Sequence, residues 1–335
     1  MASPAHDWLV QTLRDQRAVT SEPPTLAEDR AQLARYAERS VTQAGVTVTV
    51  TEIDECPGSL LFTPSEVRDD LALVHIHGGG FRVGSPANDR HLAGVLALAT
   101  RARVLSPAYR LAPEHPYPAG LDDCERAYEY AAALLPEAGI VVGGGSAGAS
   151  LAAALLLRRR DAGDRRPLGG VLFSGIYDLD PTRYSRGSWL DNATTDVILH
   201  PDAGLVMTVD YLGERITTPR VGSPLAADLA GLPPLFIQAS GAEMLLDDSL
   251  RLAEKAARAG VETTLEIWPE MLHAWQGMAG LLPEAAEALH RAADFIDRVV
   301  NGRVANGFAL REGPDLGGFV GVELPRPTAD PSPTG

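Results

Sequence analysis

One serine of this sequence is surrounded by glycines at a point where an apolar strand would meet a helix. It lies in Gly144-Gly145-Ser146-Ala147-Gly148, after the apolar run "IVV" and before "ASLAAALLLRRR". This Gly-x-Ser-x-Gly pattern is typical of a sharp strand-to-helix turn, where an exposed serine hydroxyl can attack a carbonyl carbon. The alternative is a glycine-rich turn that the serine only caps. We take Ser146 as the candidate nucleophile for acyl transfer.

A second glycine-rich stretch, "HIHGGGFRVGS", follows the apolar run "LALV". The N–H groups of Gly79 and Gly80 can point outward from it. Together with the N–H of Ala147 they would bind the negative oxygen of a tetrahedral intermediate. The alternative is a plain turn. His75 and His77 alternate along a strand without a neighbouring cysteine or carboxylate cluster, which disfavours a metal site.

A serine hydroxyl is a weak nucleophile, so the chemistry requires a base within hydrogen-bond reach. Where the nucleophile sits on a strand-to-helix turn of this kind, the acid and then the histidine follow it in chain order. His200, His273 and His290 lie downstream of Ser146. His290 falls in an ordinary amphipathic helical pattern and His200 in a long insertion, whereas His273 follows the last apolar strand. We therefore predict His273 as the base.

Three carboxylates could orient that histidine: Glu243, Asp247 and Asp248, in "SGAEMLLDDSLRL". The strand "LFIQA" ends before Glu243, which places this residue at the carboxyl end of a strand, where open α/β sheets bind ligands. Asp247 and Asp248 precede a helical run, where we expect them to cap free N–H groups and complement the helix dipole. Position therefore favours Glu243 as the acid.

The elements that must position these residues alternate along the chain. Short β-rich runs and longer Ala- and Leu-rich patterns predict an α/β fold, with a mostly parallel central sheet and helices on both faces. We predict strands at 46–51, 71–76, 103–106, 139–142, 170–174, 234–239 and 263–268. We predict helices at 26–44, 87–101, 120–134, 147–160, 248–259 and 284–300.

Composition narrows the classes of partner. The chain has 335 residues, 45% of them hydrophobic, with a formal net charge of -15. Such a charge repels phosphate backbones and anionic lipid surfaces, so we expect neither nucleic acid nor a membrane as partner. Two cysteines, no signal-like apolar run near the start and no membrane-length apolar stretch favour a cytoplasmic protein. The sequence leaves a homodimer open.

Taken together, these stretches resemble the hormone-sensitive-lipase family of α/β-hydrolases, carboxylesterases with a His-Gly-Gly-Gly oxyanion motif. The resemblance covers roughly residues 40–300 and rests on five ordered motifs: "HGGGF" at 77–81, "YRLAPEHPYPA" at 109–119, "GGSAG" at 144–148, "GLPPLFIQASGAEMLLDDS" at 231–249 and "LHAW" at 272–275. It implies an α/β-hydrolase fold, with Ser146 as nucleophile, His273 as base and Glu243 as acid.

Two positions depart from the family pattern. Family members usually carry an acidic residue directly before the serine, where this chain has Gly145. The segment "SPAYR" has Ser106 and Ala108 where the family often has an aspartate before the tyrosine. Neither departure involves the predicted triad.

The resemblance also implies a cap over the site. We predict N-terminal cap helices within 1–45 and an α/β-hydrolase core at 46–302 with a cap insertion at about 180–220. The insertion fills a gap between strands that is too long for an ordinary loop. The Pro-rich region 303–335 is predicted to be an extended or disordered tail.

The function expected from these features is hydrolysis of short-acyl esters through an acyl-enzyme, without a cofactor or metal. Because ligand pockets are lined by aromatic side chains, Phe81, Trp189 and Trp275 are candidate pocket walls, with core packing as the alternative for each. A lactonase or a natural-product deacetylase would use the same triad on its own small-molecule ester or lactone. A non-catalytic binding protein is a further alternative, as in plant gibberellin receptors, which resemble this family but lack the catalytic histidine. The presence of His273 favours an enzyme.

Overall fold

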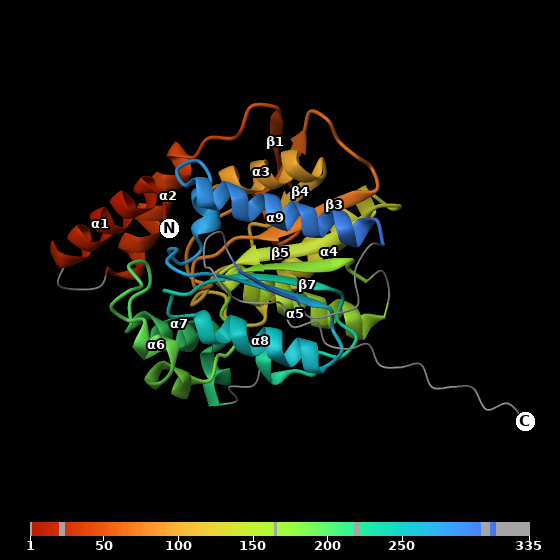
Figure 1. Cartoon of the computed structure of the whole chain (residues 1–335). Helices are drawn as coiled ribbons and strands as arrows, with labels where there is room; N and C mark the ends of the chain where they lie inside the picture. The colour runs from red at the N-terminus through yellow and green to blue at the C-terminus, as the bar shows by residue number, and fades with distance from the viewer. Residues whose placement is uncertain (1, 20–23, 164–165, 218–221, 303–308, 313–335) are drawn as a thin grey trace, which may run out of the picture.

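The central feature of the fold is one twisted sheet (Figure 1). The structure, a computed structural model, describes residues 2–19, 24–163, 166–217, 222–302 and 309–312. Within them nine strands pair in the order β1-β2-β4-β3-β5-β6-β7-β8-β9. Their bounds are Val46–Thr51, Ser59–Pro64, Leu71–Ile76, Arg103–Ser106, Gly139–Gly145, Gly169–Phe173, Leu235–Ser240, Thr263–Trp268 and Ala309–Glu312, numbered β1 to β9 in chain order. Strand β2 runs antiparallel to β1 and β4, and every other pair is parallel.

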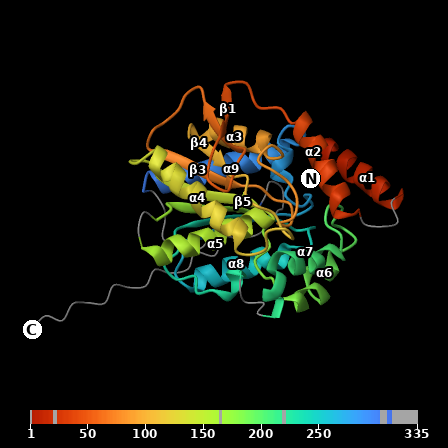
Figure 2. The same ribbon diagram turned by 180° about the vertical axis from the view of Figure 1, so that it is seen from behind.

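Nine α-helices in the described residues surround the sheet. They are α1 to α9 in chain order, at Pro4–Val19, Leu26–Arg39, Arg90–Thr100, Ala119–Leu134, Ala147–Ala162, Ser188–Asp191, Ala203–Leu212, Leu246–Arg258 and Pro283–Val300. Helices α3 and α9 cover one face of the sheet, and α4, α5 and α8 cover the other (Figures 1 and 2). Burial on both faces explains why a strand such as β3 is an unbroken apolar run, "LALV", before its first histidine.

The two faces of the sheet have separate hydrophobic cores because side chains alternate along a strand. On β3, Ala72 and Val74 pack with helices α4, α5 and α8. The intervening Leu71 and Leu73 pack with α3 and α9. The sheet is therefore held rigidly between two helical layers, and its carboxyl edge is a fixed base for loops.

The predicted elements agree closely with the observed ones. The strands predicted at 46–51, 71–76, 103–106 and 263–268 have those bounds, while the helix predicted at 26–44 ends at Arg39. Strand β2 was not predicted, and β9 falls in the region predicted as an extended or disordered tail. The other residues of that tail lie outside the described residues.

Two groups of elements lie beside the carboxyl edge of the sheet. The first is the segment between β6 and β7, called the insertion below, which contains α6, α7 and short 3₁₀ turns. In Figure 1 the insertion lies below the second group, α1 and α2. Helix α2 is joined to the core by Arg30, which donates to both carboxylate oxygens of Glu114 and to the carbonyls of Arg82 and Ala112. Helix α1 is joined to the insertion by Arg17, which donates to the carbonyl of Asp196.

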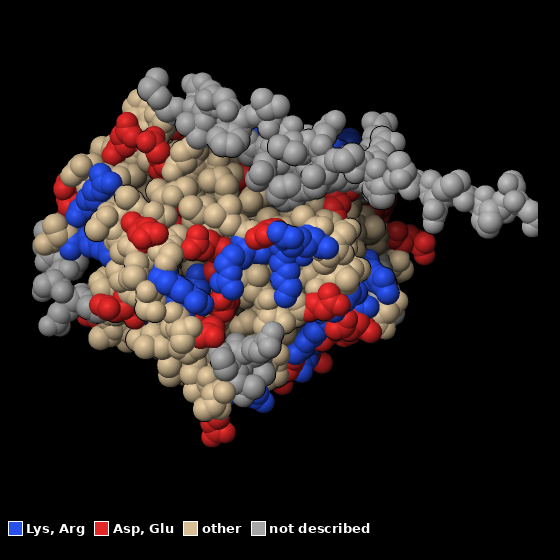
Figure 3. All heavy atoms as spheres, turned by 60° about the horizontal axis from the view of Figure 1, so that its bottom comes forward, with Lys and Arg blue, Asp and Glu red and all other residues tan. Residues whose placement is uncertain are grey.

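Charged side chains are mixed on the face of the molecule shown in Figure 3. Lysines and arginines there lie beside aspartates and glutamates and form no continuous basic surface. In the part of the chain that the structure describes, no helix is both long and apolar enough to cross a membrane.

Candidate active site

Ser146 occupies the tight corner between β5 and α5. Its φ of 53° and ψ of -121° are rare for a residue with a side chain, and such backbone strain is characteristic of functional turns. The corner requires glycine at position 148, because a Cβ there would lie 2.0 Å from the carbonyl oxygen of Ile76 at the end of β3. The helix can approach the strand this closely only without a side chain, as the Gly-x-Ser-x-Gly pattern predicts.

The hydroxyl of Ser146 is the first member of a continuous hydrogen-bonded chain. Its Oγ lies 3.0 Å from Nε2 of His273, and Nδ1 of His273 lies 2.6 Å from Oε2 of Glu243. The other carboxylate oxygen, Oε1, accepts the N–H of Ser240 at 3.0 Å. The arrangement requires Nδ1–H to donate to Glu243, which leaves Nε2 free to accept the serine proton.

The histidine and the carboxylate of this chain are removed from water. The exposed fraction is 5% for His273 and 0% for Glu243. Burial by itself lowers the pKa of His273, but the hydrogen bond and charge of Glu243, with the charge of Asp196, raise it more, so its pKa lies above the usual value. In such a low-dielectric site the carboxylate stabilises the imidazolium strongly.

The glycine loop after β3 lies directly against the serine. A Cβ on Gly78 would lie 3.3 Å from the Cβ of Ser146. Gly79 and Gly80 both have positive φ, 115° and 58°, and a Cβ on Gly79 would lie 2.0 Å from the carbonyl oxygen of Val83. The loop therefore depends on glycine, and it places the predicted oxyanion donors beside Ser146.

His77 holds the glycine loop in place through contacts of its side chain and its backbone. Its ring donates from Nδ1 to the carbonyl of Gly78 at 2.8 Å and stacks on Tyr109, with ring centroids 4.3 Å apart. The hydroxyl of Tyr109 donates to the carbonyl of His77 at 3.0 Å. Burial lowers the pKa of His77 below its usual value, so the ring is neutral and structural at neutral pH.

Comparisons with known proteins identify the family of this chain. A family model described as the alpha/beta hydrolase fold matches residues 73–277. A crystal structure of an esterase from the bacterial hormone-sensitive lipase family is 34% identical, with a TM-score of 0.82, covering 90% of this chain and 99% of the other. The chain belongs to the hormone-sensitive-lipase family of α/β-hydrolases.

Curated relatives in this family are named as esterases. An acetyl-hydrolase of Streptomyces hygroscopicus is 36% identical over 297 residues, which is 87% of this chain and 92% of the relative. The carboxylesterase NlhH of Mycobacterium tuberculosis is 32% identical over 302 residues, 87% of this chain and 90% of the relative. The prediction that this chain is an enzyme of the carboxylesterase class is confirmed.

One departure from the family pattern is sterically neutral here. At Gly145, directly before the nucleophile, a Cβ would meet nothing within 4 Å among the described residues. A side chain the size of alanine would therefore meet no steric obstacle at this position.

The prediction that Asp247 and Asp248 cap helix α8 is wrong, although both lie in its first turn, where acidic residues complement the helix dipole as predicted. Neither caps the helix through its side chain. Asp247 accepts the N–H of Ser188 at 2.9 Å, and Asp248 accepts the N–H of Tyr177 at 2.7 Å and pairs with buried Arg183. Tertiary contacts to the insertion therefore decide where these carboxylates point.

The three predicted pocket aromatics lie in different places. Phe81 is buried against Tyr211 of α7, with ring centroids 3.7 Å apart, at the junction of the glycine loop and the insertion. Trp189 of α6 is 4% exposed and donates from its indole N–H to the carbonyl of Pro201. Trp275 has no exposed surface, so it offers no wall to an open pocket.

Trp275 instead belongs to a core cluster behind the histidine loop. Its partners there include Trp268, Met271 and Leu272, with helix α1 packed on the outside. Aromatic character alone was a poor guide here, because Trp275 begins a 3₁₀ turn and its side chain is fully buried.

Other histidines stand apart from the triad. His290 is exposed on α9, and its Nδ1 bonds with the carbonyl of Ala286 on its own helix. His200 lies in the insertion beside exposed Asp202, and His75 pairs with Asp89 at 3.0 Å. Within the described residues no group of three or more His, Cys, Asp or Glu side chains is arranged to hold a metal ion.

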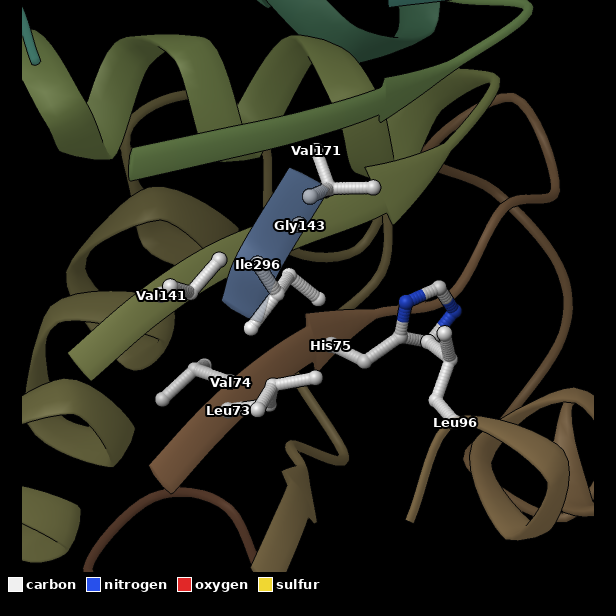
Figure 4. Close-up of a pocket in the computed structure, with 8 residues that line it drawn as sticks. All are labelled: Leu73, Val74, His75, Leu96, Val141, Gly143, Val171 and Ile296. Atoms are coloured by element: carbon white, nitrogen blue, oxygen red, sulfur yellow. The ribbon is translucent and has the colours of Figure 1, made fainter. Parts of the chain in front are cut away.

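Figure 4 shows a small cavity on the α3 and α9 side of the sheet. Its lining is apolar apart from His75 and comprises Leu73, Val74, His75, Leu96, Val141, Gly143, Val171 and Ile296. None of the triad residues lines it. We assign it to imperfect packing beneath the sheet.

Sequence reasoning missed two serines that hold the histidine loop. Ser174, directly after β6, accepts the N–H of Ala274 on its Oγ at 3.1 Å. Ser240, the last residue of β7, donates its hydroxyl to the carbonyl of Met271 at 2.5 Å. The backbone on both sides of His273 is therefore tied to the carboxyl ends of two strands. Ser174 follows one buried strand and Ser240 ends another, and nothing else in the local sequence distinguishes them.

Proposed function

We propose that this chain hydrolyses short-acyl carboxylic esters through a Ser146-His273-Glu243 triad and a covalent acyl-enzyme. The observation that carries the proposal is the hydrogen-bonded chain from Ser146 Oγ through both ring nitrogens of His273 to Glu243, with distances of 3.0 and 2.6 Å. Hydrogen bonds of this length and order are those of a serine hydrolase whose base is already oriented.

In the first half of the reaction, Nε2 of His273 takes the proton of Ser146 while Oγ attacks the ester carbonyl carbon. The carbonyl oxygen becomes negatively charged, and the N–H groups of Gly79, Gly80 and Ala147 are the donors proposed to bind it. His273 then gives the proton to the alcohol oxygen as the carbon–oxygen bond breaks. The alcohol leaves, and the acyl group stays on Ser146.

In the second half, water replaces the alcohol. His273 takes a proton from the water as its oxygen attacks the acyl carbon, and returns the proton to Ser146 Oγ as the acid departs. Throughout, Glu243 holds the Nδ1–H tautomer and stabilises the imidazolium by its charge. These steps balance with ester and water alone, so the mechanism requires no cofactor.

Two observations favour a short acyl group, and acetyl esters in particular. A relative at 36% identity is named an acetyl-hydrolase. Met207 of α7 lies close to the proposed oxyanion loop, since a Cβ on Gly80 would be 3.3 Å from the Met207 side chain. A side chain at this distance would limit the space for a long acyl chain beside the loop. Deacetylation of a natural product is therefore the second candidate, and a lactonase would use the same atoms. The hydrogen-bonded His273 disfavours a purely binding function.

The test is a hydrolysis panel of p-nitrophenyl esters from acetate to palmitate, run beside several lactones and an acetylated natural product. We expect kcat/KM to be highest for acetate to butyrate and to fall with chain length. Faster turnover of palmitate than of butyrate would contradict the short-acyl proposal. In parallel, diethyl p-nitrophenyl phosphate should add one diethyl phosphoryl group, and peptide mapping should find it on Ser146. Labelling at another residue would contradict the proposed nucleophile.

Several features remain predictions from the sequence alone. They are the division into cap and core, the cytoplasmic location, a possible homodimer and the absence of nucleic acid and membrane partners.

A further inference from the structure

The loop that carries Glu243 is bound along its backbone by side chains of the insertion. Asn192 donates from Nδ2 to the carbonyls of Gly241 and Glu243, at 3.1 and 2.8 Å. The hydroxyl of Thr195 lies 3.0 Å from the carbonyl oxygen between them, that of Ala242, and 3.1 Å from the carbonyl oxygen of Asn192, and these two acceptors share its one proton. Three consecutive carbonyls of this acid loop, residues 241–244, thus accept hydrogen bonds from one short segment of the insertion.

Asp196 completes the attachment from the same segment. Its Oδ2 accepts the N–H of Met244 at 2.9 Å. Its Oδ1 accepts the N–H groups of Ile198 and Leu199, both at 2.9 Å. The residue is 3% exposed, and a buried carboxylate is stable only when hydrogen-bonded in this way. Asp196 therefore joins a turn of the insertion to the residue directly after Glu243.

The segment that holds the acid loop is itself anchored. Arg17 of α1 donates to the carbonyls of Asp196 and Leu199, at 2.7 and 3.2 Å. Ser188 donates its hydroxyl to the carbonyl of Met244 at 2.9 Å and accepts the N–H of Asp247 at 3.0 Å. The contacts form a network that runs from the N-terminal helix through the insertion to the acid loop.

Asp196 also acts on the base through its charge. The carboxylates whose charges act on His273 are Glu243, which bonds to it directly, and Asp196. Both raise the pKa of His273 against the effect of burial. Removing the charge at Asp196 while keeping its shape should therefore make the imidazole easier to deprotonate.

We propose that Asn192 and Asp196 are positioning residues, through which the insertion fixes the acid loop and holds Glu243 in line with His273. The insertion is then part of the catalytic framework as well as a cover for the substrate. This inference rests on the triad mechanism proposed above. It predicts that a loosened segment impairs the chemical step more than substrate binding.

The main experiment is a double-mutant cycle between Asn192→Ala and Glu243→Gln. Asn192 is half-buried at the edge of the loop, so its replacement leaves the core intact. If it acts through Glu243, Asn192→Ala lowers kcat by about 10-fold in the wild-type background and by less than about 2-fold in Glu243→Gln. KM should change by less than about 2-fold in both backgrounds. Rates are normalised to the concentration of folded protein, measured by the amplitude of the thermal unfolding transition, so a loss of folded protein does not count as a loss of kcat.

Asp191→Ala is the matched control, because Asp191 is the exposed neighbour of Asn192 on the same turn. It should leave kcat within about 2-fold of wild type. Equal losses of kcat from Asn192→Ala in both backgrounds, or a loss that Asp191→Ala reproduces, would overturn the positioning role.

Asp196→Asn supplies an independent readout. Both carboxylate oxygens of Asp196 accept backbone N–H groups, so the amide of Asp196→Asn would place an NH₂ donor against one of them. We expect kcat at the optimal pH to fall about 10-fold and the acidic limb of the kcat/KM profile to move to lower pH. A wild-type kcat would overturn the positioning role of Asp196. Ser146→Ala is run alongside. If it is inactive while Asn192→Ala is fully active, the positioning inference alone fails, whereas an active Ser146→Ala would refute the triad mechanism itself.

Discussion

His273 and Glu243 are joined by a 2.6 Å hydrogen bond although they lie on loops after two different strands, β8 and β7. The strands are parallel neighbours, and their last residues, Trp268 and Ser240, are paired in register. Both loops therefore start at the same edge of the sheet. The register of two strands thus brings a base and an acid 30 residues apart in sequence into contact.

The first prediction concerns the identity of the acid. Glu243→Gln keeps the shape of the side chain but removes its charge and its preference for the Nδ1–H tautomer. We expect kcat to fall by roughly 10²- to 10⁴-fold, with little change in melting temperature. Steady-state kinetics with p-nitrophenyl butyrate and thermal denaturation measure the two effects.

Asp247→Ala is the matched control for this assignment, since Asp247 lies on the same segment but bonds to Ser188 of the insertion. It should lower the free energy of unfolding by about 1 kcal/mol and lower kcat by less than about 10-fold, far less than Glu243→Gln. If Asp247→Ala abolished turnover in a folded protein while Glu243→Gln stayed active, the acid would be misassigned.

The pH dependence of activity follows from the raised pKa of His273. Protonated imidazole cannot accept the proton of Ser146, so kcat/KM falls as the pH falls through the pKa of His273. Because that pKa is raised, the acidic limb should lie above the value of about 6.5 that is usual for histidine. In Glu243→Gln the largest raising influence is gone, and the limb should move to lower pH. A limb at the same pH in both proteins would show that another group titrates.

A third prediction contrasts two glycines of the corner. Gly148→Ala would bring a Cβ to 2.0 Å from the Ile76 carbonyl oxygen, whereas Gly145→Ala meets nothing within 4 Å among the described residues. We expect Gly148→Ala to lose at least about 3 kcal/mol of unfolding free energy, and Gly145→Ala to remain within about 0.5 kcal/mol of wild type. Urea denaturation followed by fluorescence compares them. Equal stabilities would refute the close approach of α5 to β3.

Ser174 provides a test of how the histidine loop is held. Ser174→Ala removes the acceptor for the N–H of Ala274, the residue after His273. We expect kcat to fall about 10-fold, equivalent to about 1.4 kcal/mol of barrier, with KM little changed. Ser106→Ala is the control, because Ser106 ends β4 and its buried hydroxyl has no hydrogen-bond partner among the described residues. A similar loss of kcat in both variants would assign the effect to packing.

The sequence predicts well those parts of the fold where burial or backbone geometry permits only a few residue types. Strands β3 and β8 are buried on both faces, so they must be apolar runs, and their bounds were predicted correctly. Ser146 was identifiable because the corner requires glycine at positions 144 and 148. A Cβ at either position would collide with neighbouring backbone atoms.

The parts that sequence missed are decided by contacts between distant segments. Asp247 fits a helix cap by local pattern, yet its partner, Ser188, is 59 residues away. Ser174 and Ser240 are ordinary residues in sequence and acquire a role only when two strand ends meet the histidine loop. Strand β2 is short and ends in proline, so its pairing with β1 and β4 was invisible locally.

The most direct test of the whole account is the turnover number of purified Ser146→Ala with p-nitrophenyl butyrate. The Oγ of Ser146 is the atom 3.0 Å from the base, and no other step of the proposed mechanism can replace its attack on the carbonyl carbon. We predict a folded protein with the wild-type melting temperature, within about 2 °C, and a kcat reduced by roughly 10³-fold or more. A folded Ser146→Ala enzyme with wild-type kcat would contradict the account.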